Sequence, residues 1–378
     1  MMQLELILFS IIIIAYGIII TLAIVGINYL NISRTNNSKL LEPPFISIIL
    51  SFRNESNNAH AFINEIIKQS YNKDFFELIL VDDFSDDNSY EIFESTLKQT
   101  DLKFTLIKQT QHRGKKHNLA QAIEIANGTI IVTTDADVNF RHKNWLSTIA
   151  TYFENNKPNA LVMPIDFEEP KNIISLFQVT ENLALTGITA GFCGINKPFL
   201  CNGANFAFLK EAYQKVGGYL SHISISSGED VFLLEDLKKI DASKIHYGFN
   251  NELIVNTKAI ETIPEFLNQR LRWAGKSKYN SNLFSQTFGF IIIVANLLFL
   301  TIGVSYIKNL PITPYLSIFA LTKLIFDFLL LFLASKFLGK TKYLWFIIPF
   351  ECVYWLYAII VGIGSMFIKP TWKGIKVK

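Results

Sequence analysis

The stretch GTIIVTTDAD, residues 128–137, joins a run of β-branched residues to two carboxylates that are one residue apart. An apolar, β-branched run of this length behind a glycine predicts a buried strand. Asp135 and Asp137 then lie at its carboxyl end. Two carboxylates there suit a hard divalent cation, Mg²⁺ or Mn²⁺, which keeps other coordination sites open for phosphate oxygens. Taken alone, the pattern is more often a turn built from aspartates than a metal site.

Long apolar runs flank a polar central region, and the first two of them carry no charge. The first is Leu6–Tyr29, the second is Leu283–Ile307, and two more cover about 312–335 and 343–368. Each run is long enough to cross a bilayer, so a multi-pass integral membrane protein is expected. The expected division has three parts: an N-terminal transmembrane anchor at 1–30, a globular domain at 31–280 and a C-terminal transmembrane region at 281–378.

Lysine and arginine are distributed unevenly around these runs, which predicts the side that each end faces. Basic residues follow the first run and precede the second: Arg34, Lys39, Arg270, Arg272, Lys276 and Lys278. The central domain is therefore expected on the cytosolic face. Four full crossings would leave the lysine-rich tail, residues 369–378, outside, against the rule. Either the last run does not fully cross or the tail is an exception.

Bulk composition excludes some classes of function. The formal net charge is +3, and no pattern of interleaved basic and aromatic residues is present, so a nucleic acid is not expected as a partner. Cys193, Cys201 and Cys352 are too few and too scattered for a disulfide framework or a zinc site.

Strands and helices alternate through the first part of the central region. Strands are predicted at Phe45–Ser51, Phe76–Val81 and Phe104–Lys108 and before Asp135, with helices at Ala59–Gln69 and from Gly114 to about Ala126. Continuous apolar strands between helices predict an α/β fold with a mostly parallel sheet covered on both faces. Ligands of such sheets bind at the carboxyl ends of the strands. The polar clusters Arg53–Glu55, Asp82–Asp87 and Asp135–Asp137 all follow strands.

Five motifs in register now carry a family resemblance. They are Val81-Asp82-Asp83-x-Ser85, Gly114-Lys115-Lys116-x-Asn118-Leu119, Asp135-Ala136-Asp137, Gly228-Glu229-Asp230 and Gln269-Arg270-Leu271-Arg272-Trp273. In this order, over roughly residues 44–275, the chain resembles an inverting glycosyltransferase of family 2 with a GT-A fold. The closing Q-R-x-R-W with flanking apolar runs is similar to the membrane-embedded branch. That branch includes hyaluronan, cellulose, chitin and poly-N-acetylglucosamine synthases and ceramide glucosyltransferase.

The resemblance implies a donor side for the site. Asp137, supported by Asp135, would hold the cation that bridges the two phosphates of a nucleotide-sugar. Asp83, and less firmly Asp82, would contact the nucleotide, because a carboxylate can accept the N–H of a pyrimidine ring. Asn54 and Glu55 would lie near the nucleotide, with a helix cap as the alternative. Lys115, at a helix start, would bind the diphosphate or a sugar hydroxyl, with a solvated lysine pair as the alternative.

The resemblance also implies an acceptor side. Asp230, with Glu229 beside it, would take the proton of the acceptor hydroxyl, and N-capping of the following helix is the alternative. Many relatives have Thr or Ser where this chain has Gly228. The segment Cys201–Asn205 resembles a small-residue acceptor motif, although a plain turn fits nearly as well.

A helix expected at about 260–275 could lie at the membrane surface. The resemblance places Gln269, Arg270, Arg272 and Trp273 at the acceptor and diphosphate, whereas an interfacial anchor is the alternative. Asn172–Thr189 is a second amphipathic stretch that could line the acceptor side.

Charges inside the last two apolar runs need an explanation because they are costly in a membrane. Lys323 and Asp327 are one helical turn apart and can pair with each other, and Glu351 lies in the fourth run. The alternative is that Lys323 serves a lipid-phosphate or sugar path.

The resulting hypothesis is a sugar transfer from a nucleotide-sugar, with a UDP-sugar favoured, to a lipid-linked or saccharide acceptor at the cytosolic face of a bacterial plasma (inner) membrane. A processive polysaccharide synthase is the first alternative, and a non-catalytic nucleotide-sugar-binding subunit is the second.

Overall fold

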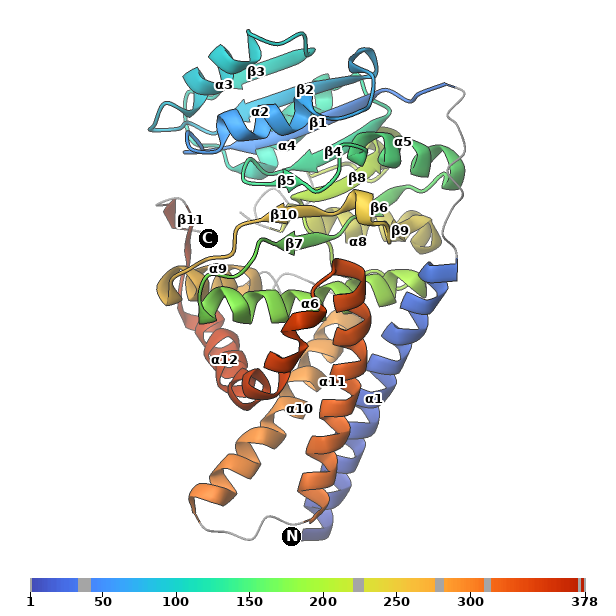
Figure 1. Ribbon diagram of the computed structural model, residues 1–378, viewed down its shortest axis with the longest axis vertical. Helices are drawn as coiled ribbons and strands as arrows, with labels where there is room; N and C mark the ends of the chain where they lie inside the picture. The colour runs from blue at the N-terminus through green and yellow to red at the C-terminus, as the bar shows by residue number, and fades with distance from the viewer. Residues whose placement is uncertain are drawn as a thin grey trace.

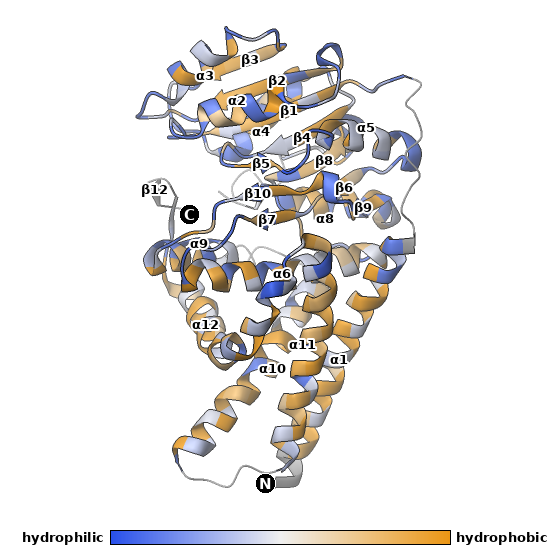
Figure 2. Ribbon diagram, viewed as in Figure 1, coloured by the Kyte–Doolittle hydropathy of each residue, from blue (hydrophilic) through white to orange (hydrophobic). Residues whose placement is uncertain are grey.

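The structure, a computed structural model, describes residues 2–32, 42–219, 228–275, 282–308, 314–372 and 375–376. An α/β domain forms one end of the molecule and long apolar helices form the other (Figure 1, Figure 2). Several residues used above lie outside the described ranges: Arg34, Lys39, Lys276, Lys278, Lys373 and Lys378.

A seven-stranded sheet organises the α/β domain. Its strand order is β3-β2-β1-β4-β8-β6-β9. The strands are β1 (Ile46–Phe52), β2 (Phe76–Asp82), β3 (Phe104–Lys108), β4 (Ile130–Thr134), β6 (Ala160–Val162), β8 (Asn205–Leu209) and β9 (Ile245–Tyr247). All neighbouring pairs are parallel except those of β8, which runs antiparallel to β4 and β6. The predicted mostly parallel α/β sheet is confirmed.

Helices cover both faces of this sheet, which explains why its strands are continuous apolar runs. On one face, Ile48 and Leu50 of β1 pack in a core with α2 (Ala59–Ile67), α3 (Ser89–Leu97) and α5 (Trp145–Asn156). On the other face, Ile49 of β1 belongs to a core that includes α4 (Lys115–Ile125) and α8 (Glu229–Asp241). Alternate residues of one strand therefore serve two cores.

A small second sheet lies between the large sheet and the long helices (Figure 1). It has the order β5-β10-β7 and consists of β5 (Asn139–Phe140), β7 (Ile165–Phe167) and β10 (Val255–Thr257). The short elements α7 (Lys210–Lys215), η1 (Lys73–Phe75), η3 (Ala242–Lys244) and η4 (Asn251–Leu253) complete the domain.

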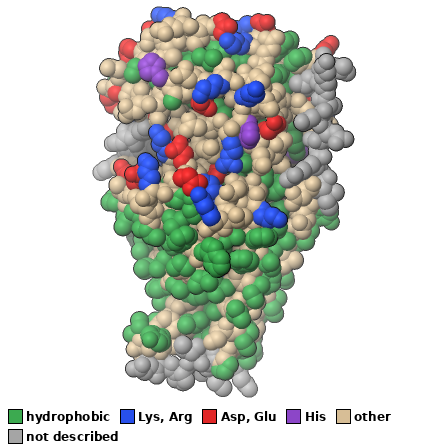
Figure 3. Space-filling view, viewed as in Figure 1, with side chains coloured by type: hydrophobic (Ala, Val, Ile, Leu, Met, Phe, Trp, Pro, Cys, Tyr) green, Lys and Arg blue, Asp and Glu red, His purple; other side chains and the backbone are tan. Residues whose placement is uncertain are grey.

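Within the described ranges, five helical segments are long and apolar enough to cross a membrane. Four correspond to the predicted runs: α1 (Met2–Ile32), α10 (Leu283–Ile307), α11 (Pro314–Leu338), and η6 (Thr341–Phe346) with α12 (Ile347–Phe367). The fifth is α6 (Ile173–Gly194), which had been predicted as an amphipathic stretch. Exposed apolar side chains cover the helical half of the molecule, whereas charged side chains concentrate on the α/β domain (Figure 3).

The helix α6 lies crosswise beneath the α/β domain, while α1, α10 and α11 run away from it (Figure 1). Small residues allow α6 to approach α1 closely. A Cβ atom added to Gly26 would lie 1.8 Å from the backbone oxygen of Gly191, and one added to Gly194 would lie 2.2 Å from that of Gly26. Such contacts between backbones require glycine and pack helices tightly without polar groups.

The last apolar segment begins and ends next to the α/β domain. Before it, Arg141 donates to the Leu338 carbonyl (3.2 Å) and Lys340 to the Phe167 carbonyl (3.0 Å). After it, Asn268 of α9 (Ile263–Gly275) exchanges hydrogen bonds of 2.7 and 2.9 Å with the backbone of Thr371, at the start of β11 (Thr371–Trp372). The strand β11 accordingly lies beside the α/β domain, whereas α1 begins at the far end of the long helices (Figure 1).

Candidate active site

The carboxyl ends of β1, β2 and β4 meet at one edge of the sheet. Phe52 is paired with Asp82, and Leu50 is paired with Thr134. The three polar clusters that follow these strands therefore emerge side by side, as the sequence predicted.

Asn54 and Glu55 connect the first two of these loops. The Asn54 N–H donates to Ser85 Oγ (3.0 Å), its side-chain oxygen accepts from the Asp86 N–H (2.9 Å), and the Glu55 N–H donates to Ser89 Oγ (2.7 Å). Asn54 has a φ of 53°, in the left-handed region that asparagine tolerates better than most residues. The N-cap of α2 is Asn58, so neither residue is the helix cap that was the alternative.

Asp82 and Asp83 differ in how their carboxylates are occupied. Asp83 is fully buried, accepts from the Arg113 and Gly114 N–H groups (2.9 and 3.1 Å), and pairs with His112 Nδ1 at 2.7 Å. Asp82 is also fully buried, but its Oδ2 has no hydrogen-bond partner among the described residues. Burial raises the pKa of Asp82 despite hydrogen bonds from Ser85. The sequence favoured Asp83 for the nucleotide contact, whereas the acceptor left available in the structure belongs to Asp82.

Lys115 lies between the end of β4 and the first turn of α8. It opens α4 behind Gly114, whose φ of 87° suits glycine. Its Nζ lies 2.6 Å from Asp135 Oδ1 and 3.5 Å from Glu229 Oε1. Burial alone would lower the pKa of Lys115, but the carboxylates of Asp135, Glu229 and Asp230 raise it above its usual value. The ammonium therefore stays charged at the centre of the site, and the alternative of a solvated lysine pair does not describe it.

Asp135, Asp137 and Glu55 concentrate negative charge at the end of β4. Desolvation, followed by the charges of Asp135 and Glu55, raises the pKa of Asp137. Thr257 donates to Asp137 Oδ2 at 3.1 Å. Close carboxylates repel one another when they are ionised, and a bound cation would relieve this repulsion. Carboxylate oxygens are also the ligands that hard cations prefer. No cluster of three or more acidic, His or Cys side chains with metal-site geometry occurs in the described ranges, so protein ligands alone do not complete such a site.

Asp230 lies in the first turn of α8 and is held by two backbone groups. Its Oδ2 accepts from the Gly203 N–H (3.0 Å) and its Oδ1 from the Val231 N–H (2.9 Å). A Cβ atom on Gly203 would lie only 3.5 Å from that of Asp230, so the segment Cys201–Asn205 packs directly against Glu229 and Asp230. The N-cap residue of α8 is Gly228, which leaves Asp230 inside the helix rather than at its cap.

The Q-R-L-R-W segment divides between two environments. Arg272 is close enough to Glu229, Asp135 and Asp230 for their charges to raise its pKa, although burial has the larger effect and lowers it. No hydrogen bond of the Arg272 guanidinium is found within the described part of the chain.

Arg270 lies away from these carboxylates. It is buried and forms an ion pair with Glu181 of α6 (2.5 Å), while its guanidinium lies 4.3 Å from the ring of Trp273 and donates to Gln269. The predicted diphosphate contact of Arg270 therefore has no support from its position. Arg270 links α9 to α6 through Glu181, because a buried guanidinium requires a charged partner, while Gln269 and Trp273 contact Arg270 within α9.

Three partners escaped the sequence analysis: Thr257, His112 and Glu181. Each lies far in sequence from the residue that it contacts, as with Thr257 and Asp137. His112 precedes the Gly114-Lys115 motif by two residues, which was the only available signal.

Comparisons with known proteins agree with this geometry. Residues 47–217 match the sequence profile of Glycosyl transferase family 2. The chain is 31% identical over 103 residues to glycosyltransferase AglE of Haloferax volcanii, covering 27% of this chain and 33% of that protein. It is 24% identical over 235 residues to the poly-beta-1,6-N-acetyl-D-glucosamine synthase of Staphylococcus epidermidis, covering 61% of this chain and 53% of that one. The chain thus spans about a third to half the length of these curated relatives.

A solved structure supports the fold. The mannosyltransferase PcManGT from Pyrobaculum calidifontis, in complex with GDP-Man and Mn²⁺, superimposes with a TM-score of 0.56 at 15% identity, covering 95% of this chain and 99% of that one. At this identity the likeness concerns the fold. The profile match and the α/β architecture together identify residues 47–217 as a family 2 glycosyltransferase domain of the GT-A fold, carried by a chain with several membrane-length helices.

Proposed function

We propose that this chain transfers a sugar from a nucleotide-sugar, preferably a UDP-sugar, to a hydroxyl group near the membrane surface, with inversion at the anomeric carbon. The observation that carries the proposal is the position of Lys115 between Asp135, at the end of β4, and Glu229, beside Asp230. The Lys115 ammonium therefore lies between the end of β4, which suits a diphosphate, and the first turn of α8, where the Asp230 carboxylate suits the role of a base.

On the donor side, Asp137 and Asp135 would hold a divalent cation, Mg²⁺ or Mn²⁺. Such an ion would neutralise charge that develops on the leaving nucleoside diphosphate. Lys115 and Arg272 add positive charge from the protein itself, and a guanidinium can bind phosphate through two parallel hydrogen bonds. Asp82 Oδ2 would accept the N–H of a uracil ring, while Asp83 positions the 112–114 segment beside it.

On the acceptor side, Asp230 would accept the proton of the attacking hydroxyl as the bond to the anomeric carbon forms. The backbone N–H groups of Gly203 and Val231 fix the orientation of its carboxylate. Glu229 would hold Lys115 in place rather than exchange protons, because its Oε1 lies 3.5 Å from that ammonium.

We further propose the division into an anchor at 1–30, a cytosolic catalytic domain at 31–280 and a membrane region at 281–378. The positive charges around the apolar runs support a cytosolic catalytic domain in a plasma membrane. The α6 and α9 helices form the boundary between the α/β domain and the apolar helices (Figure 2). An acceptor lipid, or a lipid-linked sugar, would approach the site there.

Polymerisation is the second candidate. It is favoured by the similarity to a poly-beta-1,6-N-acetyl-D-glucosamine synthase over 61% of this chain. Transfer of one or a few sugars is preferred, because the described membrane-length helices are few and pack closely against one another, as the contact of Gly26 with Gly191 illustrates.

The test is release of nucleoside diphosphate by the purified chain in nanodiscs, with a panel of UDP- and GDP-sugars and with Mg²⁺, Mn²⁺ or a chelator. We expect Asp230→Asn to lower kcat by about 10³-fold, within the range for loss of a general base. Asp236→Asn, which removes a carboxylate from the same helix, should leave kcat unchanged. Labelled product would be separated by solvent partition and by size. Turnover that survives in Asp230→Asn would overturn the assignment of the base, and a high-molecular-weight product would establish the second candidate.

A further inference from the structure

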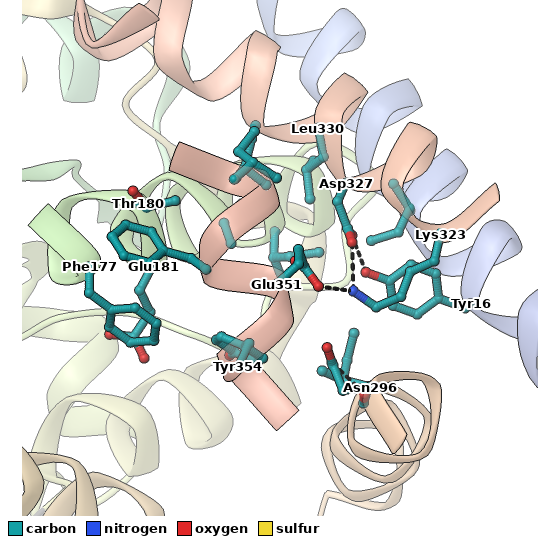
Figure 4. Close-up of a pocket in the computed structure, with 17 residues that line it drawn as sticks. Tyr16, Phe177, Thr180, Glu181, Asn296, Lys323, Asp327, Leu330, Glu351 and Tyr354 are labelled. Atoms are coloured by element: carbon teal, nitrogen blue, oxygen red, sulfur yellow. Dashed lines mark hydrogen bonds and ion pairs between the residues drawn. The ribbon is translucent and has the colours of Figure 1, made fainter. Parts of the chain in front are cut away.

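A partly open cavity with a mostly apolar lining lies among the long helices, away from the candidate active site (Figure 4). Five helices line it: α1, α6, α10, α11 and α12. Its volume of about 100 Å³ has room for several water-sized groups. Apolar side chains such as Ile20, Ile292 and Leu330 form much of the wall.

One ammonium and two carboxylates converge on one side of the cavity. Lys323 Nζ lies 2.7 Å from Asp327 Oδ2 and 2.5 Å from Glu351 Oε2, and Tyr16 donates its hydroxyl to Asp327 (Figure 4). Lys323 is 1% exposed. Its ammonium therefore already has two anionic partners, and the ionised trio carries one excess negative charge.

This charge balance selects among possible ligands. A lipid phosphate would add a second negative charge beside Asp327 and Glu351, so the role of Lys323 in a lipid-phosphate path, raised by the sequence, is disfavoured. A metal cation would have to lie close to the Lys323 ammonium, which repels it. An uncharged ligand that donates hydrogen bonds meets neither penalty.

Asn296 of α10 provides an independent sign of a ligand. It is 3% exposed, its Nδ2 donates to the Ile292 carbonyl at 2.8 Å, and its Oδ1 has no hydrogen-bond partner among the described residues. The side chain extends toward the cavity, opposite Lys323 and Glu351 (Figure 4). A buried acceptor without a donor is costly, so the site lacks a hydrogen-bond donor that a ligand would supply.

We propose that this cavity binds the hydroxyl headgroup of an uncharged lipid. The headgroup would donate hydrogen bonds to Asn296 Oδ1 and to the Glu351 carboxylate, while its acyl chains would lie against the apolar helix surfaces. Glu181, which also lines the cavity, is the ion-pair partner of Arg270 in α9. A ligand in the cavity would therefore lie beside Glu181, the residue that pairs with α9, the helix that carries Arg272. The proposal stands independently of the proposed transferase function.

The test uses the full chain in phosphatidylcholine nanodiscs, since that headgroup has no hydroxyl. Photoreactive dioleoylglycerol and photoreactive dioleoyl phosphatidic acid are compared, because they share acyl chains and glycerol and differ only in the phosphate. We expect dioleoylglycerol to label the peptides around Asn296 at least 10-fold more strongly than phosphatidic acid.

Two variants complete the test. Asn296→Leu should lower this labelling about 10-fold, and it should raise the Tm in phosphatidylcholine alone because an unsatisfied acceptor is removed. Thr301→Val, a matched polar-to-apolar change on the same helix outside the cavity, should leave the labelling unchanged. Stronger labelling by phosphatidic acid, or labelling by dioleoylglycerol that Asn296→Leu does not reduce, would overturn the proposal. Neither readout requires enzymatic turnover.

Discussion

Two lysines of this protein each lie between two carboxylates, yet their surroundings differ. Lys115 pairs with Asp135 and Glu229 at the strand ends, where the Asp135 side chain is 37% exposed. Lys323 pairs with Asp327 and Glu351 among the long helices, where the lysine side chain is 1% exposed. In the first cluster water can screen the charges, so a ligand can replace one interaction with another. In the second, removal of any member leaves a charge in buried, mostly apolar surroundings, where little water can screen it. The same trio of groups therefore suits ligand exchange at one end of the molecule and permanent pairing at the other.

The largest expected effect is on stability, from breaking the buried trio. Lys323→Met leaves Asp327 and Glu351 close together without a cation, which should lower the free energy of unfolding by about 3–5 kcal/mol. Thermal unfolding in nanodiscs would measure the loss. Lys336→Met, on the exposed side of the same helix, is the matched control and should have little effect. A Lys323→Met protein as stable as the control would show that the Lys323 cluster is not required for stability, and the contrast with the Lys115 cluster would fail.

The two arginines of α9 allow the same contrast within one helix. Arg270→Ala leaves the Glu181 carboxylate buried beside Tyr357, and a loss of about 3 kcal/mol in unfolding free energy is expected. Arg272→Ala should leave stability nearly unchanged and lower kcat/KM by about 10–100-fold, because its guanidinium faces the carboxylates of the site. Paired measurements of Tm and of diphosphate release would separate the two roles. If both variants lost the same activity and kept the same stability, Arg270 and Arg272 would not have separate roles in stability and activity.

Breaking the Lys115 cluster should affect activity rather than folding. Lys115→Met is expected to reduce kcat/KM by about 100-fold, since it removes a charge aimed at the diphosphate. The change in unfolding free energy should stay within about 1 kcal/mol, because Asp135 remains partly hydrated. Lys98→Met, which breaks an exposed pair with Glu94, serves as the control. A large drop in Tm for Lys115→Met would show that the Lys115 cluster, like the Lys323 cluster, is needed for stability.

Asp82 should show the smallest effect, with opposite signs for folding and binding. Burial raises its pKa above the ordinary 3.8, so the unfolded chain ionises first and this group lowers stability as pH rises from about 4 through the folded pKa. Asp82→Asn removes that penalty and should raise the Tm at pH 7 but not at pH 4. The affinity for UDP should fall about tenfold if Oδ2 accepts the uracil N–H. Thermal unfolding at pH 4 and pH 7 would measure the change in Tm, and titration calorimetry would measure the affinity for UDP. An unchanged UDP affinity would favour Asp83 as the residue that contacts the nucleobase.

Much of the α/β domain could be predicted because local pattern and burial agree there. Phe104–Lys108 was predicted as a strand and is β3, and the run before Asp135 is β4. The residues of β4, like those of β1 and β2, are buried throughout, so these mostly apolar runs stand out from the polar loops, whereas β3 at the sheet edge is partly exposed. The meeting of Asp82 and Asp135 at one edge then follows from parallel pairing, since parallel strands end on the same side.

Other features depended on contacts between distant segments. The separation of Arg270 from Arg272, only two positions away, results from Glu181 of α6, which nothing in the Q-R-L-R-W segment indicates. The saturation of Asp83 results from the backbone of Arg113 and Gly114, and any sequence can place backbone N–H groups there. The return of the chain at Thr371 to α9 likewise rests on Asn268, more than 100 residues earlier.

The sequence by itself determined the α/β class, the apolar segments and the acidic and basic groups available to a site, because these depend on residue type and short-range periodicity. Only the tertiary structure decided which of those groups meet. It placed Lys115 between Asp135 and Glu229, and it surrounded Lys323 with Asp327 and Glu351 in a buried site among the long helices. The physical reason is that charge interactions depend on distance and on exclusion of water, and both are set by packing between elements far apart in the chain.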